Sequence, residues 1–241
     1  MSTDALLVAL DVDTVEEALT LADDLRGVVG GYKIGSRLFT SRGPSLVQQM
    51  VAKGDRVFLD LKFHDIPNTV AGAVAAATRL GVWMVNVHAS GGEEMMRAAR
   101  TAADDEARRA GIAPPLVIAV TVLTSFDQAG LSSVGISNAV PDQVARLARL
   151  AQTAGLDGVV ASPQEIGLIR DACGPDFAIV TPGIRGAGDQ KGDQKRTASA
   201  NDALAAGASY LVVGRPIIAA PNPRAAAERI ATECAGPRNR A

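Results

Sequence analysis

The stretch that decides the fold runs from Val57 to Thr69 and reads Val-Phe-Leu-Asp-Leu-Lys-Phe-His-Asp-Ile-Pro-Asn-Thr. It opens with a short apolar run, which predicts a buried strand. Asp60 and Lys62 share one face at the end of that strand, because side chains alternate along a strand. Pro67 then fixes the first turn of a helix. Charged groups at the end of a buried strand are costly unless they pair or take part in chemistry, so we expect a functional site there.

The same pattern, a short apolar run followed by a longer amphipathic segment, repeats along the whole chain. It predicts buried strands at 6–10, 31–34, 57–61, 83–87, 116–122, 158–161, 178–180 and 210–213. It predicts helices at 15–25, 44–52, 67–80, 93–109, 141–154, 163–171, 198–206 and 223–234. Strict alternation implies parallel strands joined by helical crossovers. Eight such units in 241 residues favour a (β/α)8 barrel over an open doubly wound sheet.

The bulk composition narrows the class of protein. A chain of 241 residues can form one large α/β domain or two small ones, and no Pro/Ser-rich linker interrupts it, so we expect one domain over 1–241. A net charge of -2 gives no reason to expect a nucleic-acid or anionic-membrane partner. The apolar run near the N-terminus is too short for a signal peptide, which favours a soluble, cytoplasmic protein. Cys173 and Cys234 are expected to be reduced thiols.

Polar residues recur at the same end of nearly every predicted strand. In barrel enzymes the loops that follow the strands carry the active site. The residues in question are Asp11, Lys33, Asp60, Lys62, Asp65, His88, Thr124, Ser125, Pro182, Arg185 and Arg215. A single polar residue at such a place is an ordinary loop residue facing water, but six or seven in register would require independent coincidences. The pattern therefore predicts one active site at the carboxyl end of the barrel.

The last two strands point to a phosphate site. Loops after strands seven and eight of such barrels commonly bind phosphate through backbone N–H groups and a basic side chain. Gly214 and Arg215 suit that role, because glycine allows close approach and a guanidinium matches phosphate oxygens. The glycine-rich, polar segment 183–196 reads as a mobile loop that closes over the phosphate, with Arg185 and Gln194 as contacts. A small phosphorylated metabolite is the expected substrate.

Cofactor signatures are missing from the sequence. His64 and His88 are the only histidines, and they lie on no metal-ligand spacing with each other, so no zinc site is expected. No glycine-rich dinucleotide fingerprint or nucleotide-hydrolase phosphate loop is found, so no nucleotide cofactor is expected either.

The motifs, taken in order, resemble the orotidine 5′-phosphate decarboxylase family over essentially the whole chain. The block from Asp60 to Thr69 is the most specific of them. The others are Leu10-Asp11, Lys33, Thr121-Val-Leu-Thr124-Ser125, Thr181-Pro-Gly-Ile-Arg185, Gly192-Asp-Gln194 and Val213-Gly-Arg215.

The resemblance implies a cofactor-free and metal-free decarboxylation of orotidine 5′-phosphate to UMP, the last step of de novo pyrimidine synthesis. It implies that Lys62 stabilises the C6 carbanion and donates the replacing proton, with Asp60 facing the departing carboxylate. Lys33 and Asp65 would complete an alternating array of charges. The implied substrate-binding residues are Asp11, Lys33, Ile66, Thr69, Thr124, Pro182, Arg185, Gln194, Gly214 and Arg215. It further implies a homodimer in which Asp65 and Thr69 enter the neighbouring subunit's site.

Several alternatives stay open at this point. The Asp-x-Lys-x-x-Asp core is shared with related barrels such as 3-keto-L-gulonate 6-phosphate decarboxylase, so a magnesium-dependent decarboxylase or aldolase acting on a sugar phosphate is the main competitor. Lys33 favours the orotidylate reading, because the metal-using relatives present an acid there. A catalytically silent barrel that binds a phosphometabolite is the third possibility. The duplicated Gly-Asp-Gln-Lys leaves Gln190 and Gln194 as rival loop contacts, and the context Gly-Asp-Gln-x-Arg favours Gln194.

Overall fold

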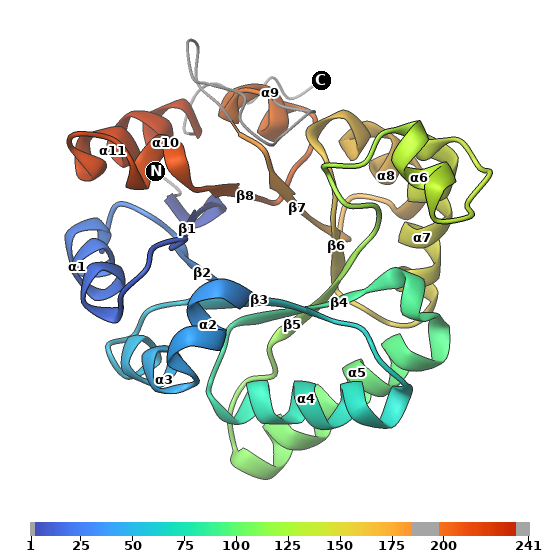
Figure 1. The fold of residues 1–241 in the computed structure, drawn as a ribbon, viewed down its shortest axis with the longest axis horizontal. Helices are drawn as coiled ribbons and strands as arrows, with labels where there is room; N and C mark the ends of the chain where they lie inside the picture. The colour runs from blue at the N-terminus through green and yellow to red at the C-terminus, as the bar shows by residue number, and fades with distance from the viewer. Residues whose placement is uncertain (1–2, 185–197, 235–241) are drawn as a thin grey trace.

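The computed structural model describes residues 3–184 and 198–234. In this part of the chain eight parallel strands pair in sequence order and close into a barrel, as the alternation of elements predicts (Figure 1). The strands are β1 (Leu6–Ala9), β2 (Gly31–Gly35), β3 (Val57–Phe63), β4 (Met84–His88), β5 (Leu116–Val120), β6 (Gly158–Val160), β7 (Ala178–Pro182) and β8 (Tyr210–Val213). The expected mobile loop at 183–196, with Arg185, Gln190 and Gln194, lies outside the described residues except for its first two positions.

Helices surround the barrel on the outside (Figure 1). They are α1 (Val15–Leu25), α2 (Ser36–Arg42), α3 (Ser45–Ala52), α4 (Pro67–Arg79), α5 (Glu93–Ala110), α6 (Gln128–Ser133), α7 (Val140–Thr153), α8 (Ile166–Cys173), α9 (Ala200–Ala205), α10 (Arg215–Ile218) and α11 (Pro223–Cys234). Within the described residues, no helix has the length and apolarity needed to cross a bilayer.

Local chemistry explains most of the helix starts. Thr14 caps α1 by accepting the Glu17 N–H, and two glutamates occupy the first turn, where carboxylates suit the helix dipole. Pro67 stands at the first position of α4, which lacks a side-chain cap. The segment predicted as one helix at 163–171 is a 3-10 turn over Pro163–Glu165 followed by α8. Ser162 and Glu165 form a capping box around that turn.

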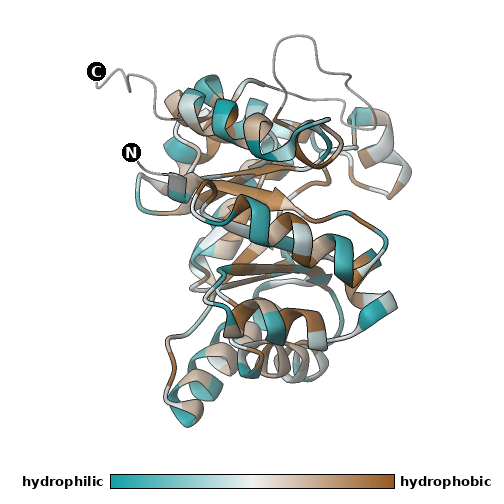
Figure 2. Ribbon diagram, turned by 90° about the vertical axis from the view of Figure 1, so that its left-hand side faces the viewer, coloured by the Kyte–Doolittle hydropathy of each residue, from teal (hydrophilic) through white to brown (hydrophobic). Residues whose placement is uncertain are grey.

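The core has two parts, separated by the wall of the barrel. The larger part lies between strands and helices, and Figure 2 shows the strands mostly brown while the helices alternate between teal and brown. The smaller part fills the barrel interior with Leu7, Ala9, Phe58, Met84, Ile118, Val180 and Val212. Toward the carboxyl ends of β2, β3 and β4 this filling gives way to buried polar side chains, namely Lys33, Asp60 and Asn86. The barrel thus offers an apolar floor beneath a charged layer.

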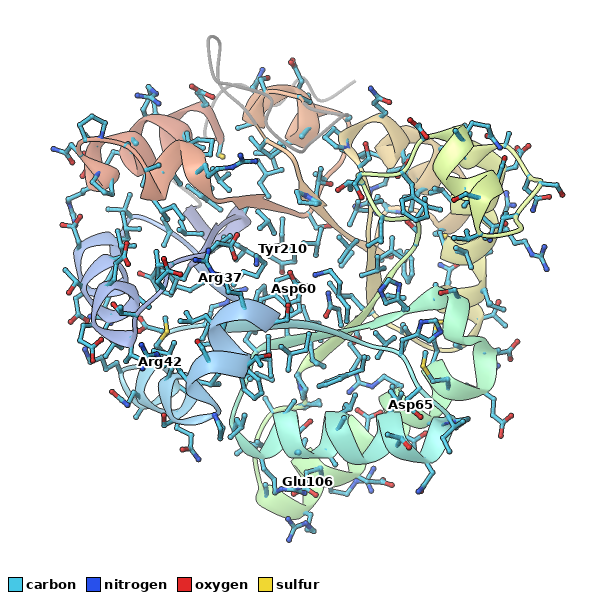
Figure 3. The ribbon with its side chains drawn as sticks, in the orientation of Figure 1. Arg37, Arg42, Asp60, Asp65, Glu106 and Tyr210 are labelled. Atoms are coloured by element: carbon cyan, nitrogen blue, oxygen red, sulfur yellow. The ribbon has the colours of Figure 1, made fainter. Side chains whose placement is uncertain are left out.

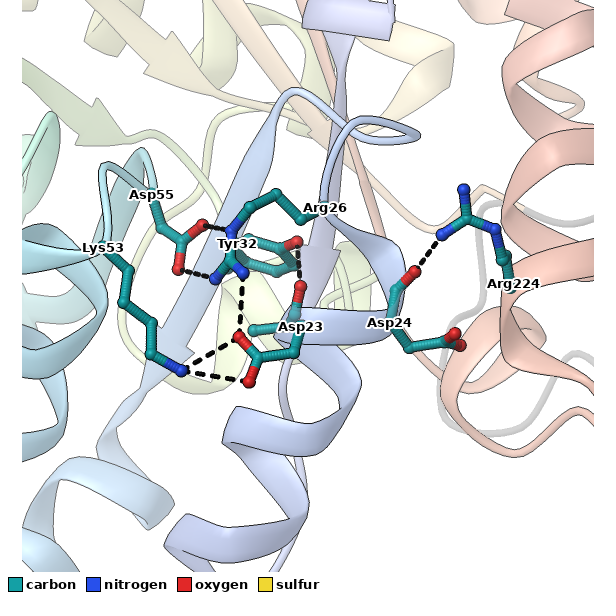
Figure 4. A network of polar contacts seen from close by, with 8 residues as sticks. Asp23, Asp24, Arg26, Tyr32, Lys53, Asp55 and Arg224 are labelled. Atoms are coloured by element: carbon teal, nitrogen blue, oxygen red, sulfur yellow. Dashed lines mark hydrogen bonds and ion pairs between the residues drawn. The ribbon is translucent and has the colours of Figure 1, made fainter.

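A network of ion pairs holds the opposite end of the barrel, where the strands begin (Figure 4). Arg26, just after α1, donates two hydrogen bonds of 2.9 Å to the Asp55 carboxylate ahead of β3. Asp23 accepts from both Arg26 and Lys53, and these cations lower the pKa of its carboxyl, Lys53 most. Tyr32 on β2 donates to the Ala22 carbonyl at 2.7 Å. This network ties α1 to β2 and β3, the strands that carry the charged layer.

Candidate active site

A cavity of about 490 Å³ opens at the carboxyl ends of the strands. Its floor is apolar and includes Ala9, Phe58, Val160 and Val212. Eight of the residues expected at the site line it: Asp11, Lys33, Asp60, Lys62, Thr124, Pro182, Gly214 and Arg215. These residues come from strands far apart in the sequence, and closure of the barrel brings them to one mouth.

Four charged side chains form a continuous array along one wall of the cavity. Lys33 Nζ donates to Asp11 Oδ1 at 3.1 Å and lies 3.4 Å from Asp60 Oδ2. Lys62 Nζ donates to the other oxygen of Asp60, Oδ1, at 2.6 Å. The side chains of Lys33 and Asp60 are only 11% and 12% exposed, whereas that of Lys62 is 38% exposed. Signs alternate along the array, so each buried charge has an opposite neighbour, and the two ends, Asp11 and Lys62, are the more exposed members, at 53% and 38%.

The strand that carries Asp60 and Lys62 is irregular. Pairing between β3 and β4 shifts between Leu59 and Phe63. Among the described residues other than glycine, Lys62 alone has a positive φ, at 54°. Asp60 and Lys62 meet on one face as the alternation predicts, but the contact forms within a distorted stretch of strand. Such local strain is typical of functional sites.

On the far side of the mouth, the chain turns from β8 directly into a short helix. Gly214 is the N-cap of α10, and Arg215 is its first residue. A short extra helix after strand eight is a common phosphate site in barrels of this type. A Cβ at position 214 would lie 3.5 Å from Ala9 Cβ and 3.7 Å from Asp11 Oδ2, so it would occupy this corner of the cavity at ordinary van der Waals distances.

Three expected site residues do not line the chain's own cavity. Asp65, Ile66 and Thr69 lie between β3 and the first turn of α4, and all three are exposed. Figure 3 shows Asp60 near the middle of the barrel and Asp65 farther out, beside the start of α4. Asp65 Oδ1 accepts the N–H of Ile66 at 2.7 Å, and the Ile66 side chain is 66% exposed. These residues lie outside the cavity that holds the charged array of their own chain.

The two histidines lie together beyond the array. The rings of His64 and His88 are 5.3 Å apart and tilted by 32°. Burial is the main cause that lowers the pKa of His88, with smaller contributions from His64 and Lys62. The residues that the structure describes contain no group of three or more histidine, cysteine or acidic side chains arranged to hold a metal ion.

Comparison with known proteins agrees with the arrangement. The model of the orotidine 5′-phosphate decarboxylase / HUMPS family matches residues 4–230. A protein from Moorella thermoacetica named orotidine 5′-phosphate decarboxylase is 55% identical over 95% of this chain and 92% of its own length. One of the same name from Paramagnetospirillum magneticum is 52% identical over 94% of this chain and 96% of its own. The chain belongs to the orotidine 5′-phosphate decarboxylase / HUMPS family.

A solved structure supports the assignment to this family at the level of the fold. The crystal structure of orotidine 5′-phosphate decarboxylase from Lactobacillus acidophilus has a TM-score of 0.85 and 36% sequence identity, over 95% of this chain and 98% of that one.

Two residues of the site were not predicted from the sequence of this family member. Asn86 is fully buried in the middle of β4 and contacts both Asp60 and the backbone of Lys62. A lone amide within the otherwise apolar run Met-Val-Asn-Val was the available signal. Arg37, near the start of α2, lines the cavity and pairs with Asp13 of the segment that follows β1. The sequence indicated Arg37 more weakly, because α2 follows β2 without a loop that would mark the end of the strand.

Proposed function

We propose that this protein decarboxylates orotidine 5′-phosphate to UMP without a metal or organic cofactor, with Lys62 as the proton donor. The observation that carries the proposal is the Asp60–Lys62 ion pair of 2.6 Å, held above an apolar floor in a member of this family. A lysine ammonium at the positive end of a neutral array suits a reaction that develops negative charge on carbon.

The proposed chemistry is a single exchange at C6 of the pyrimidine. The bond between C6 and the carboxylate breaks, CO2 leaves, and the electron pair stays on C6. Lys62 Nζ stabilises this carbanion and transfers a proton to it, and the neutral amine then recovers a proton from solvent. Asp60 orients the Lys62 ammonium, since it accepts the ammonium's hydrogen bond at 2.6 Å.

The sizes of the energies favour stabilisation of the carbanion, over repulsion between Asp60 and the substrate carboxylate, as the main contribution to catalysis. Two like charges about 4 Å apart interact by roughly 4 kcal/mol at an effective dielectric near 20. Enzymes typically lower barriers by about 8–23 kcal/mol. Stress between Asp60 and the substrate carboxylate is therefore too small to carry the reaction, and we assign the larger share to Lys62 and to binding energy from the phosphate.

The charged array also argues against the competing magnesium-dependent chemistry. Among the described residues, Asp11 and Asp60 are the acidic groups of the cavity wall, and the ammonium of Lys33 lies between them, at 3.1 Å and 3.4 Å. A divalent cation bound between the same carboxylates would have to displace or discharge this lysine. Lys33 supplies the positive charge that a metal would bring.

The rest of the cavity fits the substrate's other groups. Gly214 and Arg215 would bind the phosphate, together with Arg185 and Gln194 of the segment 183–196, which we propose closes over it. Thr124 would contact the pyrimidine amide, and Pro182 would lie against the ring. Asp11 and Lys33 would contact the ribose hydroxyls. Support comes from the shared cavity, which six of these residues line, namely Asp11, Lys33, Thr124, Pro182, Gly214 and Arg215.

A homodimer would complete the site. Asp65, Ile66 and Thr69 are exposed and do not line their own cavity, which suits residues that serve a neighbouring subunit. We further propose that the protein is a single-domain cytoplasmic enzyme.

The experiment that tests the proposed function is an assay with purified protein and orotidine 5′-phosphate in the presence of EDTA. We expect loss of the orotate absorbance, with UMP and CO2 formed in equal amounts and no change when metal or nucleotide is added. Activity that EDTA abolishes and magnesium restores would instead favour the sugar-phosphate alternative. Binding of UMP without turnover would favour a silent barrel.

A further inference from the structure

Asn86 is a buried amide whose two ends contact two different parts of the charged array. Its side chain is on β4, with no exposed surface. The Oδ1 atom accepts the backbone N–H of Lys62 at 2.8 Å, and the Nδ2 atom donates to Asp60 Oδ1 at 2.7 Å. Burying an amide without partners is costly, and here each end has a partner at short distance. Asn86 does not line the cavity, so it acts through these neighbours and not on a ligand.

The first contact falls where β3 is distorted. Between Leu59 and Phe63 the strand loses its regular register with β4, and Lys62 has a φ of 54°. A left-handed backbone costs about 1–2 kcal/mol in a residue with a Cβ, so it persists only where the surroundings hold it. The Asn86 Oδ1 atom binds the N–H of this very residue. It therefore helps to hold the backbone that sends the Lys62 side chain into the cavity.

The second contact fixes the rotation of the Asp60 carboxylate. Oδ1 of Asp60 accepts from both Asn86 Nδ2 and Lys62 Nζ, at 2.7 Å and 2.6 Å. Oδ2 is thereby turned toward Lys33, at 3.4 Å. One amide thus sets the geometry on both sides of the ion pair between Asp60 and Lys62.

We propose that Asn86 is a positioning residue for the decarboxylation, which keeps Lys62 Nζ and the Asp60 carboxylate in reacting geometry through these two hydrogen bonds. The inference rests on the proposed function and deepens it. It predicts an effect on the chemical step and little effect on binding, because the groups proposed for phosphate and ribose contact lie on other strands. A displacement of about 1 Å at a reacting group can lower a rate by about 100-fold.

Two substitutions separate the contacts. Asn86→Leu keeps the approximate volume and removes both hydrogen bonds. Asn86→Asp keeps an acceptor for the Lys62 N–H but sets a carboxylate against Asp60. Two adjacent carboxylates raise the pKa of the pair, and once one proton is bound the acid again donates to its neighbour. Lys33, Lys62, His64 and His88 are the other titratable groups around this pair, and they are unchanged in both variants.

The test measures kcat, KM and UMP affinity of wild type and both variants between about pH 8 and about pH 5.5, with Thr78→Val as a control. Thr78 is equally buried and donates to the Val74 carbonyl within α4, so its loss reports the effect of deleting a buried hydrogen bond elsewhere. We expect Asn86→Leu to lower kcat by about 10- to 100-fold with KM changed less than about threefold. We expect the kcat of Asn86→Asp to be far below that of wild type at high pH, and the ratio of the two kcat values to rise as the pH falls.

Each other outcome has a definite meaning. A kcat for Asn86→Leu within about twofold of wild type, or an Asn86→Asp variant whose activity relative to wild type does not rise toward low pH, would overturn the positioning role. If Asn86→Leu fails to fold, the pH profile of Asn86→Asp alone decides. Wild-type protein inactive on orotidine 5′-phosphate would refute the proposed function itself, a result that the variants cannot mimic.

Discussion

At the scale of single residues, Lys62 combines a strained backbone with the charge on which the proposed reaction depends. Its φ of 54° would suit glycine, yet glycine has no ammonium. The site therefore trades some stability for the position of one charge, as is common where activity and stability compete.

Replacing Lys62 by alanine and by glycine tests both properties. Each variant loses the ammonium, so we expect turnover to collapse in both while UMP still binds at the phosphate end. A fall of less than about tenfold, equivalent to some 1.4 kcal/mol, would exclude Lys62 as the proton donor. We also expect Lys62→Gly to be more stable than Lys62→Ala by about 1 kcal/mol in chemical denaturation, because glycine accepts positive φ without strain.

Arg215 tests the phosphate end of the cavity. We expect Arg215→Ala to raise KM for orotidine 5′-phosphate and also to lower kcat, because phosphate binding energy is proposed to drive closure of the segment 183–196. Arg37→Ala is the matched comparison, since it removes the same charge from the same cavity but from α2 instead of α10. Steady-state kinetics give kcat and KM for both variants. An unchanged KM for Arg215→Ala would exclude Arg215 from the phosphate site.

At the scale of elements, local sequence patterns predicted the strands and the longer helices. All eight strands and the helices α1, α3, α4, α5, α7, α8, α9 and α11 were predicted from apolar runs, caps and proline starts such as Pro67, because those signals are local. The helices α2, α6 and α10 were missed. Each has seven residues or fewer, too few turns for an amphipathic period to show.

The residues of the site also fall into those that local patterns predict and those that they do not. Residues at strand ends, such as Asp11 and Lys33, could be predicted because the fold brings every strand end to one mouth. The contacts of Asn86 could not, because they depend on the shifted register between β3 and β4, which no local pattern encodes.

Two glycines test the packing of elements with a matched pair of substitutions. A Cβ on Gly158, the first residue of β6, would lie 2.2 Å from the carbonyl oxygen of Ala178, its partner on β7. We expect Gly158→Ala to destabilise the protein by about 1–3 kcal/mol, since the two strands must separate. Gly167 is exposed within α8 with open space around it, so Gly167→Ala should add about 0.5–1 kcal/mol. Equal unfolding midpoints for the two variants would contradict this account.

At the scale of the whole molecule, we propose that one chain supplies only part of the site. The four charges of the array belong to a single cavity, whereas Asp65 stands outside it beside the exposed Ile66. If two chains face each other across a two-fold axis, each Asp65 enters the cavity of its neighbour. The fifth charge of the proposed array would then come only with the second subunit.

Mixing two inactive variants tests this arrangement. Lys62→Ala and Asp65→Ala chains are unfolded together and refolded, which makes about half of the dimers mixed. If Asp65 serves the neighbour, one site of each mixed dimer carries both lesions and the other carries neither, so about a quarter of wild-type activity should return. Lys62→Ala mixed with Asp60→Ala is the control, because those two side chains form a 2.6 Å ion pair within one chain and no intact site can form. A silent first mixture, with subunit exchange verified by mass-tagged chains, would refute the shared site, and activity in both mixtures would point to contaminating wild type.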